Sequence, residues 1–400
     1  MSDERAQVFS DGVEVIRDIK GVESIRPLWE QMHQSSAFHV INGDIDRYIS
    51  VIRGLGNQAK PYVLIIRAGG KPRAILVGRI EKHRLKIKFG YKSIFEPTLS
   101  ALAVEYGGIL GEMTEELSAF LLSELQKKLK EKEFDVFFFN HLRTDSVLYG
   151  LSKSKPGFLC RTHFPKIEIH RNMIVPDSMD SFYAARSKKH RGNLKRILRD
   201  IDSAYPGKIR VATYKGGEDL EKGIAAAAQI SRMTYQHALA AGFEDNELTR
   251  VLTATAAGKG WVRLSVLYVG EKPCSFQLGL VYNRTYFMSQ IGFDPEFRNY
   301  SVGVVLFLKV LEQLCADSSV ELIDFGFGDA DYKSRFGSDS WEEASLYIFA
   351  PRLRTVFVNA VQTLMASISI TAEVILRKTG LLRLVKRRWR DVLRDSREDS

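Results

Sequence analysis

Runs of apolar and β-branched residues, broken by turns that contain glycine, divide the chain into a repeating order of strands and helices. An apolar run at residues 62–66, and another at 264–269, precedes such a turn, and a strand-like run follows it, which predicts a β-hairpin in each half. The two turns share residues at the same spacing: Gly69, Lys71, Pro72 and Gly78 in the first, and Gly270, Lys272, Pro273 and Gly279 in the second. The chain therefore carries an internal repeat.

The elements that follow the two hairpins repeat as well. Apolar residues at helical spacing from Leu117 to Leu129 predict a helix, and apolar runs predict a strand on either side of it. The predicted strand, helix and strand cover 102–106, 117–129 and 135–139 in the first half, and 285–291, 302–315 and 321–325 in the second. This order is typical of a parallel strand pair buried on both faces of a sheet, so each half is predicted to be a mixed α/β domain.

The length of 400 residues agrees with two domains of similar size. We place them at 1–155 and 156–350, followed by a basic amphipathic helical tail at 351–400. The link between the domains contains the alternating run 166–170, which indicates an edge strand and hence a structured crossover.

Composition and charge describe a globular protein with anionic partners. Apolar residues make up 45% and charged residues 26% of the chain, which excludes a disordered or fibrous architecture. The net charge is +10, and the excess lies in residues 186–199 and 377–397. The first stretch could be a solvated helix face, but its closely spaced cations repel one another, and an anionic ligand would relieve that repulsion.

Cysteine and histidine positions suggest neither disulfides nor a metal site. Cys160, Cys274 and Cys315 are scattered within or beside apolar runs, and the histidines show no metal-ligand spacing. The polar N-terminus lacks an apolar signal segment, so a cytoplasmic location is expected. No Gly-x-Ser-x-Gly elbow supports a hydrolase triad.

The segment that follows the strand 285–291 is suited to binding a pyrophosphate. It runs from Gly292 and Phe293 through Arg298 and Ser301 to Gly303, at the start of the predicted helix. Free backbone amides at a helix N-terminus bind phosphate oxygens, although Ser301 could also be an ordinary helix N-cap.

The spacing of Arg298, Ser301 and Gly303 resembles the Gln/Arg-x-x-Gly-x-Gly/Ala loop of GNAT acetyltransferases, with Ser301 in place of the first glycine. The segment 324–333 and the basic segment 186–196 resemble those of the CelD-type acetyltransferases of cellulose and exopolysaccharide clusters. Tandem halves with an interposed basic helix are also similar to the Fem-type aminoacyltransferases of peptidoglycan bridges. The corresponding first-half segment, 106–111, lacks the loop pattern, so that half is expected to bind no cofactor.

The resemblance implies two tandem GNAT-like domains and an N-acyltransferase that uses acyl-CoA, such as acetyl-CoA, without a metal. The residues that it assigns to the cofactor are Ile291, Gly292, Phe293, Arg298, Ser301 and Gly303. The residues that it assigns to catalysis are Asp324, Tyr332 and Lys333. Alternatively, Asp324 could cap the following turn, and Lys333 could bind an anionic substrate while Tyr332 merely packs. The residues expected to bind the acceptor are Arg186, Lys188, Lys189, Arg191 and Asp329.

The acceptor implied by the resemblance is an amine of an envelope or exopolysaccharide precursor, on an amino-sugar or amino acid. A Fem-like enzyme would instead take its acyl group from aminoacyl-tRNA and bind RNA phosphates through the basic segment. A third possibility is a non-catalytic envelope-assembly scaffold. Residues 377–394 mix cations with leucines and Trp389, which favours peripheral contact with the anionic inner membrane over a spanning helix, unless the tail packs on the second domain.

Overall fold

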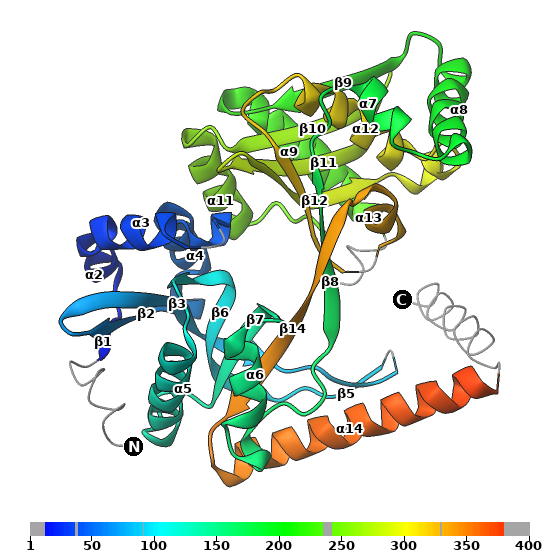
Figure 1. Cartoon of the computed structure of the whole chain (residues 1–400). Helices are drawn as coiled ribbons and strands as arrows, with labels where there is room; N and C mark the ends of the chain where they lie inside the picture. Colours follow the sequence, from blue (N-terminus) through cyan, green and yellow to red (C-terminus); the bar gives the residue numbers. More distant parts are fainter. Residues whose placement is uncertain (1–12, 37–38, 91, 235–241, 329, 380–400) are drawn as a thin grey trace. The chain divides into compact units, whose positions relative to one another are not determined.

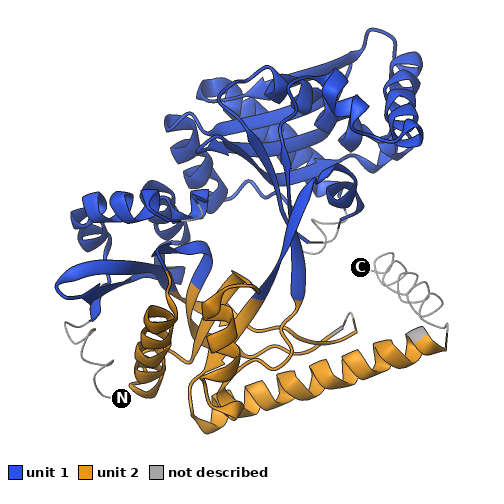
Figure 2. Ribbon diagram, viewed as in Figure 1, with its two compact units in different colours: residues 1–79, 104–112, 167–344 blue, residues 80–103, 113–166, 345–400 orange. Residues whose placement is uncertain are grey.

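The computed structural model describes residues 13–36, 39–90, 92–234, 242–328 and 330–379 (Figure 1). Contacts divide the chain into two compact units (Figure 2). Unit 1 comprises residues 1–79, 104–112 and 167–344, and unit 2 comprises residues 80–103, 113–166 and 345–400. Neither unit coincides with one half of the sequence, because residues of the first half belong to both units.

The first half of the chain forms the hairpin, the helix and the strands that its pattern predicts. Its elements, with η denoting a 3-10 helix, are β1 (Val13–Ile16), α2 (Ile19–Ser24), α3 (Arg26–Gln34), η2 (Ile41–Gly43), α4 (Ile45–Leu55), η3 (Gly56–Gln58), β2 (Ala59–Ala68), β3 (Lys71–Arg84), β4 (Ile87–Phe89), β5 (Lys92–Phe95), β6 (Thr98–Gly111), α5 (Glu115–Lys130), β7 (Val136–Arg143), α6 (Val147–Ser154) and η4 (Phe158–Cys160).

The second half repeats this order with additional elements. They are β8 (Ile167–Ile174), α7 (Met179–Ala184), α8 (Lys188–Ala204), β9 (Ile209–Tyr214), α9 (Gly217–Arg232), α11 (Glu247–Gly258), β10 (Val262–Val269), β11 (Lys272–Tyr282), β12 (Thr285–Phe293), η5 (Pro295–Tyr300), α12 (Val302–Cys315), β13 (Leu322–Phe327), α13 (Asp331–Phe336), β14 (Asp339–Phe349) and α14 (Leu353–Lys378). The mixed α/β fold is therefore confirmed, and the hairpins form as predicted, with Gly69 and Gly270 at φ of 58° and 60°.

Unit 1 holds a sheet with strands in the order β14-β8-β13-β12-β11-β10-β9. Residues that alternate along β10 pack on opposite faces of this sheet: Leu267 contacts the cluster that contains α12, and Leu264 and Val266 contact the cluster that contains α9. The central strands are thus covered on both sides, which explains their nearly continuous apolar sequence.

The crossover strand β8 corrects the prediction of an edge strand. It pairs with β13 on one side and with β14 on the other, so it lies inside the sheet. Its polar residues were the misleading signal, because the His170 side chain is only 2% exposed and contacts the carboxylates of Asp324 and Glu343 instead of solvent.

The N-terminal helices also belong to unit 1. The Trp29 indole of α3 donates to the Gly43 carbonyl at 2.7 Å, and the cluster around it joins α4 to β2 and β3. Helix α4 packs on α11 of the second half, where the hydroxyls of Ser50 and Thr255 lie 2.7 Å apart and Lys259 pairs with Asp46. Sequence-distant parts of the chain therefore share one unit.

Unit 2 contains α5, β7, the β4–β5 ribbon and α14. Buried Val358 of α14 packs with Leu85 and Ile87 of the first half and with Phe349 of β14, so α14 contacts residues from both halves of the sequence. Within the described residues, one helical segment, Leu353–Leu376, is long and apolar enough to cross a membrane by length and composition, with a mean hydropathy of 1.4. Most of the basic stretch 377–394 lies outside the described residues.

Candidate functional site

The site begins where β12 and β13 separate. Their parallel ladder covers only Thr285–Phe287 paired with 322–324. Beyond it, β12 continues to Phe293 alongside β11 alone, with a bulge where the pairing shifts past Ser289. Because an antiparallel partner uses only alternate backbone groups of a strand, the remaining groups of residues 288–293 face the opening between the two strands.

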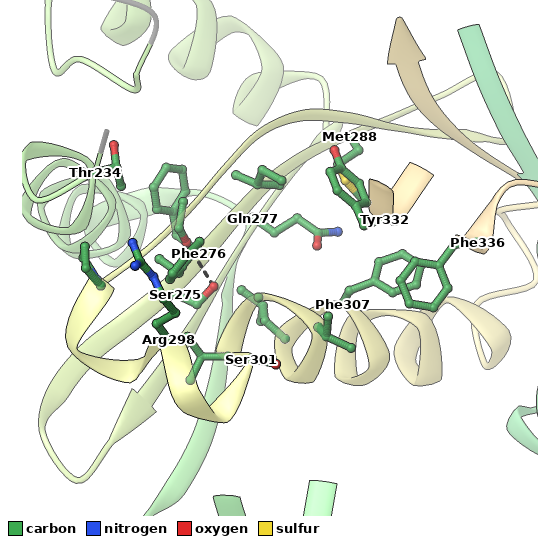
Figure 3. Close-up of a pocket in the computed structure, with 18 residues that line it drawn as sticks. Thr234, Ser275, Phe276, Gln277, Met288, Arg298, Ser301, Phe307, Tyr332 and Phe336 are labelled. Atoms are coloured by element: carbon green, nitrogen blue, oxygen red, sulfur yellow. Dashed lines mark hydrogen bonds between the residues drawn. The ribbon is translucent and has the colours of Figure 1, made fainter. Parts of the chain in front are cut away.

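A cavity of about 500 Å³ lies beside this opening (Figure 3). All six residues predicted to contact the cofactor line it, as does Tyr332. In Figure 3 Arg298 lies toward one end of the cavity and Tyr332 toward the other, with Gln277 between them. The predicted loop and one predicted catalytic residue are thus brought together. The remaining lining residues are Thr234, Ser275, Phe276, Gln277, Met288, Pro295, Val302, Val304, Leu306, Phe307 and Phe336.

The turn between β12 and α12 leaves a helix N-terminus without a side-chain cap. Ser301 lies in the left-handed region, with φ of 51° and ψ of 43°, and its hydroxyl makes no capping hydrogen bond, so the ordinary N-cap alternative is not what forms. Its carbonyl accepts from the amides of Val304 and Val305 at 2.8 and 3.1 Å. The first turn of α12 contains no acidic residue. The positive end of the helix dipole therefore meets the cavity uncompensated by a carboxylate.

Two glycines of the loop have different reasons to be glycine. A Cβ at Gly292 would lie 2.4 Å from the Phe276 ring, so a side chain there would disturb the fold. A Cβ at Gly303 would meet no protein atom within 4 Å and would project into open space. Gly303 is therefore a position where a substitution changes the cavity and leaves the packing intact.

A second cavity of about 300 Å³ adjoins the first, with which it shares Met288, Ile291 and Tyr332. Burial raises the pKa of the Tyr332 phenol to about 12, so the hydroxyl keeps its proton at neutral pH. A protonated phenol between two cavities is placed to donate a proton to a group that forms where they meet.

Asp324 lies at the end of the β12–β13 ladder in a buried cluster. Its Oδ1 accepts from the Gly326 amide at 2.6 Å and is 2.7 Å from Nε2 of His170, whose Nδ1 is 3.0 Å from Oε1 of Glu343. The Trp341 ring stacks on the imidazole at 4.3 Å. Burial lowers the pKa of His170, but hydrogen bonds to the two carboxylates outweigh that effect and raise it to about 9. The capping alternative for Asp324 is thus present, together with a histidine partner.

Lys333 is largely buried, with 9% of its surface exposed. Its Nζ donates to the Phe327 carbonyl at 2.5 Å, and it lines the second cavity. Burial lowers its pKa, against the opposing effect of Asp324 and Glu168. The lysine therefore fixes the turn after β13 and presents a cation to the second cavity.

The expected acceptor-binding residues that the structure describes lie apart from the lining of both cavities. The Arg186 guanidinium lies 3.6 Å from the centre of the Phe182 ring and donates to the carbonyls of Phe182 and Phe336, so packing occupies it. Lys188, Lys189 and Arg191 lie at the start of α8, a helix that contacts η5. Asp329 lies outside the described residues.

Sequence reasoning missed His170, Glu343 and the polar β11 residues Ser275 and Gln277. Ser275 donates to the Gly292 carbonyl at 3.0 Å, and the Gln277 amide donates to the Tyr286 hydroxyl at 2.9 Å. The signal was present, since polar residues interrupt apolar runs at these positions, but only the tertiary pairing shows what they contact. The described residues contain no group of three or more His, Cys, Asp and Glu side chains arranged to hold a metal.

Comparisons with known proteins agree with this geometry. Residues 188–334 match the acetyltransferase (GNAT) domain family. The second half of the chain carries a GNAT acetyltransferase domain. The match runs from the basic helix α8 into α13, so it contains the loop and strand residues that line both cavities, and it supports an acyltransferase activity for this part of the chain.

The fold outside the GNAT domain is also shared with solved structures. The FemX crystal structure aligns with a TM-score of 0.57 at 9% identity, covering 84% of this chain and 98% of that one. A tandem GNAT protein from the clavulanic acid biosynthesis pathway aligns with a TM-score of 0.52 at 10% identity, covering 85% of this chain and 99% of that one. At such identities the likeness shows the fold alone. No curated protein matches the sequence of this chain.

Proposed function

We propose that the GNAT domain moves an acyl group from acyl-CoA to an amine. The observation that carries the proposal is the convergence of Arg298, Ser301 and Gly303, at an uncapped helix start, on the cavity that Tyr332 also lines. Backbone amides and the helix dipole at this turn suit the CoA pyrophosphate, and the exposed Arg298 adds a positive charge.

The thioester would lie in the opening between β12 and β13. Backbone amides of residues 291–293 that β11 does not use would donate to the thioester oxygen as it gains negative charge. Such donors are worth several kcal/mol when water is excluded. The amine nitrogen attacks the carbonyl carbon, the carbon–sulfur bond breaks, and no covalent enzyme intermediate forms.

Tyr332 is the proposed general acid. The departing thiolate takes the phenolic proton, and burial keeps that proton in place until the thiolate forms. The amine loses its own proton to water in the second cavity, which Lys333 lines. We assign Asp324 the role of positioning the β13 end, since both His170 and the Gly326 amide engage its Oδ1.

The acceptor class follows from the CelD-type resemblance. We propose an amino-sugar or amino acid of an envelope or exopolysaccharide precursor, reached from the cytoplasmic face of the inner membrane by a peripheral enzyme. The exposed cations Lys188 and Lys189 of α8, next to η5, would attract the anionic parts of such a substrate or of CoA itself.

Ligand-dependent melting tests the proposal directly. Acetyl-CoA at a hundredfold its dissociation constant should add about 2.7 kcal/mol to the stability of the folded chain. Free CoA and longer acyl-CoAs in parallel samples would rank the preferred acyl group. Unchanged melting with every thioester would refute acyl-CoA binding, and the remaining hypotheses would be a Fem-like enzyme, identified by steeply salt-dependent tRNA binding, or a non-catalytic scaffold.

A further inference from the structure

Large exposed apolar side chains concentrate on unit 2. Of the nineteen such residues that the described part of the chain contains, fourteen belong to this unit, although it comprises only a third of the sequence. Exposed apolar groups at this density mark a surface that contacts a partner. None of these fourteen residues lines the two cavities of the GNAT domain.

Helix α14 carries the longest part of this surface. At 100° per residue, Leu353, Phe357, Leu364, Ile368 and Ile375 fall within a stripe about 60° wide, and each is at least 40% exposed. The stripe extends over about 33 Å at 1.5 Å per residue. It is therefore a long and narrow apolar face on one side of the helix.

The opposite side of the first turns of α14 is fixed to the rest of unit 2. Thr355, Val358 and Asn359 are buried, and the Asn359 amide donates to the carbonyls of Leu159 and Arg161 at 2.9 and 3.0 Å. Arg352 pairs with Asp135 at 3.0 Å. A helix held in this way keeps its polar side on protein, which excludes lipid from part of its circumference and argues against a spanning position.

Two neighbouring elements extend the apolar face. In the β4–β5 ribbon, Ile87 packs with Val358 of α14, and the exposed Phe95 ring lies 6.4 Å from that of Phe357. In η4, which contacts α14, Leu159 is 58% exposed. The face is thus built by elements from three separate stretches of sequence.

Cations accompany this apolar face. Lys82, Lys86 and Lys88 are exposed beside the ribbon. The sequence from 377 to 390 contains seven lysines and arginines and no acidic residue. Apolar groups flanked by cations complement an anionic lipid surface, whereas a second copy of the same face would bring like charges together.

We propose that unit 2 binds the surface of an anionic lipid bilayer, with α14 lying in the plane of the membrane and its apolar stripe in the acyl region. The proposal goes beyond acyl transfer and does not depend on it. An enzyme held in this way would meet acceptors that are themselves attached to lipid.

Vesicle co-sedimentation of the full chain tests the proposal. The chain should bind strongly to vesicles that contain phosphatidylcholine and phosphatidylglycerol, and much more weakly to vesicles of phosphatidylcholine alone. Binding to the anionic vesicles should weaken as the salt concentration rises. Leu364→Glu on the stripe should lower the partition coefficient at least about tenfold. Ile370→Glu is the matched control, because Ile370 is similarly exposed, at 47%, but points away from the stripe, and it should lower binding less than about twofold.

Both variants should melt like the parent chain and keep its response to acetyl-CoA, which separates membrane binding from the proposed function. Four results would overturn the inference. They are no binding to anionic vesicles, equal losses in the two variants, binding to neutral vesicles that resists alkaline carbonate extraction, and a dimer in solution that Leu364→Glu dissociates. The third result would indicate a spanning helix, and the fourth would indicate a second copy as the occupant.

Discussion

The two halves of the chain repeat a strand, a helix and a strand, but the ends of these elements differ. In the first half, α5 begins with Thr114, whose hydroxyl accepts from the Leu117 amide at 3.3 Å, and Glu115 and Glu116 occupy the first turn. In the second half, α12 begins without a side-chain cap or an acidic residue, beside a cavity. One helix start supplies its own negative charge, and the other leaves that place to a ligand.

The strands that follow the two helices also differ, since one carries a packing residue where the other carries a polar one. When the predicted strands 135–139 and 321–325 are aligned from their first residues, Phe138 of β7 occupies the position of Asp324 of β13. Phe138 stacks on Tyr347 at 4.5 Å, with the rings 8° from parallel, whereas Asp324 engages a histidine beside the second cavity. A duplicated fold can therefore keep one half for packing and the other for chemistry by changing a few residues at the ends of its elements.

The largest effect that we expect is on turnover, where the first half offers no counterpart. Tyr332→Phe removes the proposed acid while it keeps the ring, so kcat should fall by about 10²–10⁴ with acetyl-CoA binding unchanged. The kcat is measured from the release of free CoA, in a stopped-flow or an end-point assay. A variant with normal kcat would show that Tyr332 only packs between the cavities.

The next largest effect is expected when the start of α12 is given an acidic residue like that at the start of α5. Gly303→Glu places a carboxylate at the second helical position, where α5 has Glu116, and acetyl-CoA affinity should fall about a hundredfold, or about 2.8 kcal/mol. The melting temperature without ligand should not fall, since the position is open and an acidic residue suits a helix N-terminus. Gly303→Ala is the matched control. Full affinity in the glutamate variant, measured by calorimetry, would place the pyrophosphate elsewhere.

The Asp324 cluster should give the GNAT domain a pH dependence that the first-half aromatic stack cannot give. The pKa of His170 is about 9 when folded and about 6.5 when unfolded, so its contribution is complete below about pH 6.5 and is lost as pH rises through 9. We expect stability to fall on the order of 3 kcal/mol over that window. Denaturant titrations at several pH values should find this slope in the parent and not in His170→Gln. An equal slope in both would assign it to other groups.

The smallest expected effect tests whether the Ser301 side chain contributes to ligand binding at the uncapped helix start. Ser301 has a left-handed backbone, which a glycine adopts more easily, so Ser301→Gly should stabilise the unliganded chain by up to about 1 kcal/mol. If only backbone amides hold the pyrophosphate, acetyl-CoA affinity will stay within about twofold. A larger loss, measured in the same calorimetric series, would mean that the serine hydroxyl also contacts phosphate.

The sequence pattern predicted the regular elements closely. The helix expected over 302–315 forms over Val302–Cys315, and Arg298 and Gly303 of the loop that follows β12 line a cavity. Local periodicity and turn chemistry carry this information. The place of β8 and the partners of Asp324 could not be predicted, because His170 and Glu343 are 173 residues apart in sequence and meet only through strand pairing.

The strands β3, β6 and β14 each begin in one contact unit and end in the other. A gene cut at the midpoint would therefore sever both units at once. A fragment that starts near residue 156 would also lose α4, which covers part of α11, and would expose the Tyr282 hydroxyl that Asp44 now accepts from at 3.2 Å. Expression of the catalytic portion alone should give insoluble protein, and any fusion or truncation strategy has to retain the N-terminal helices.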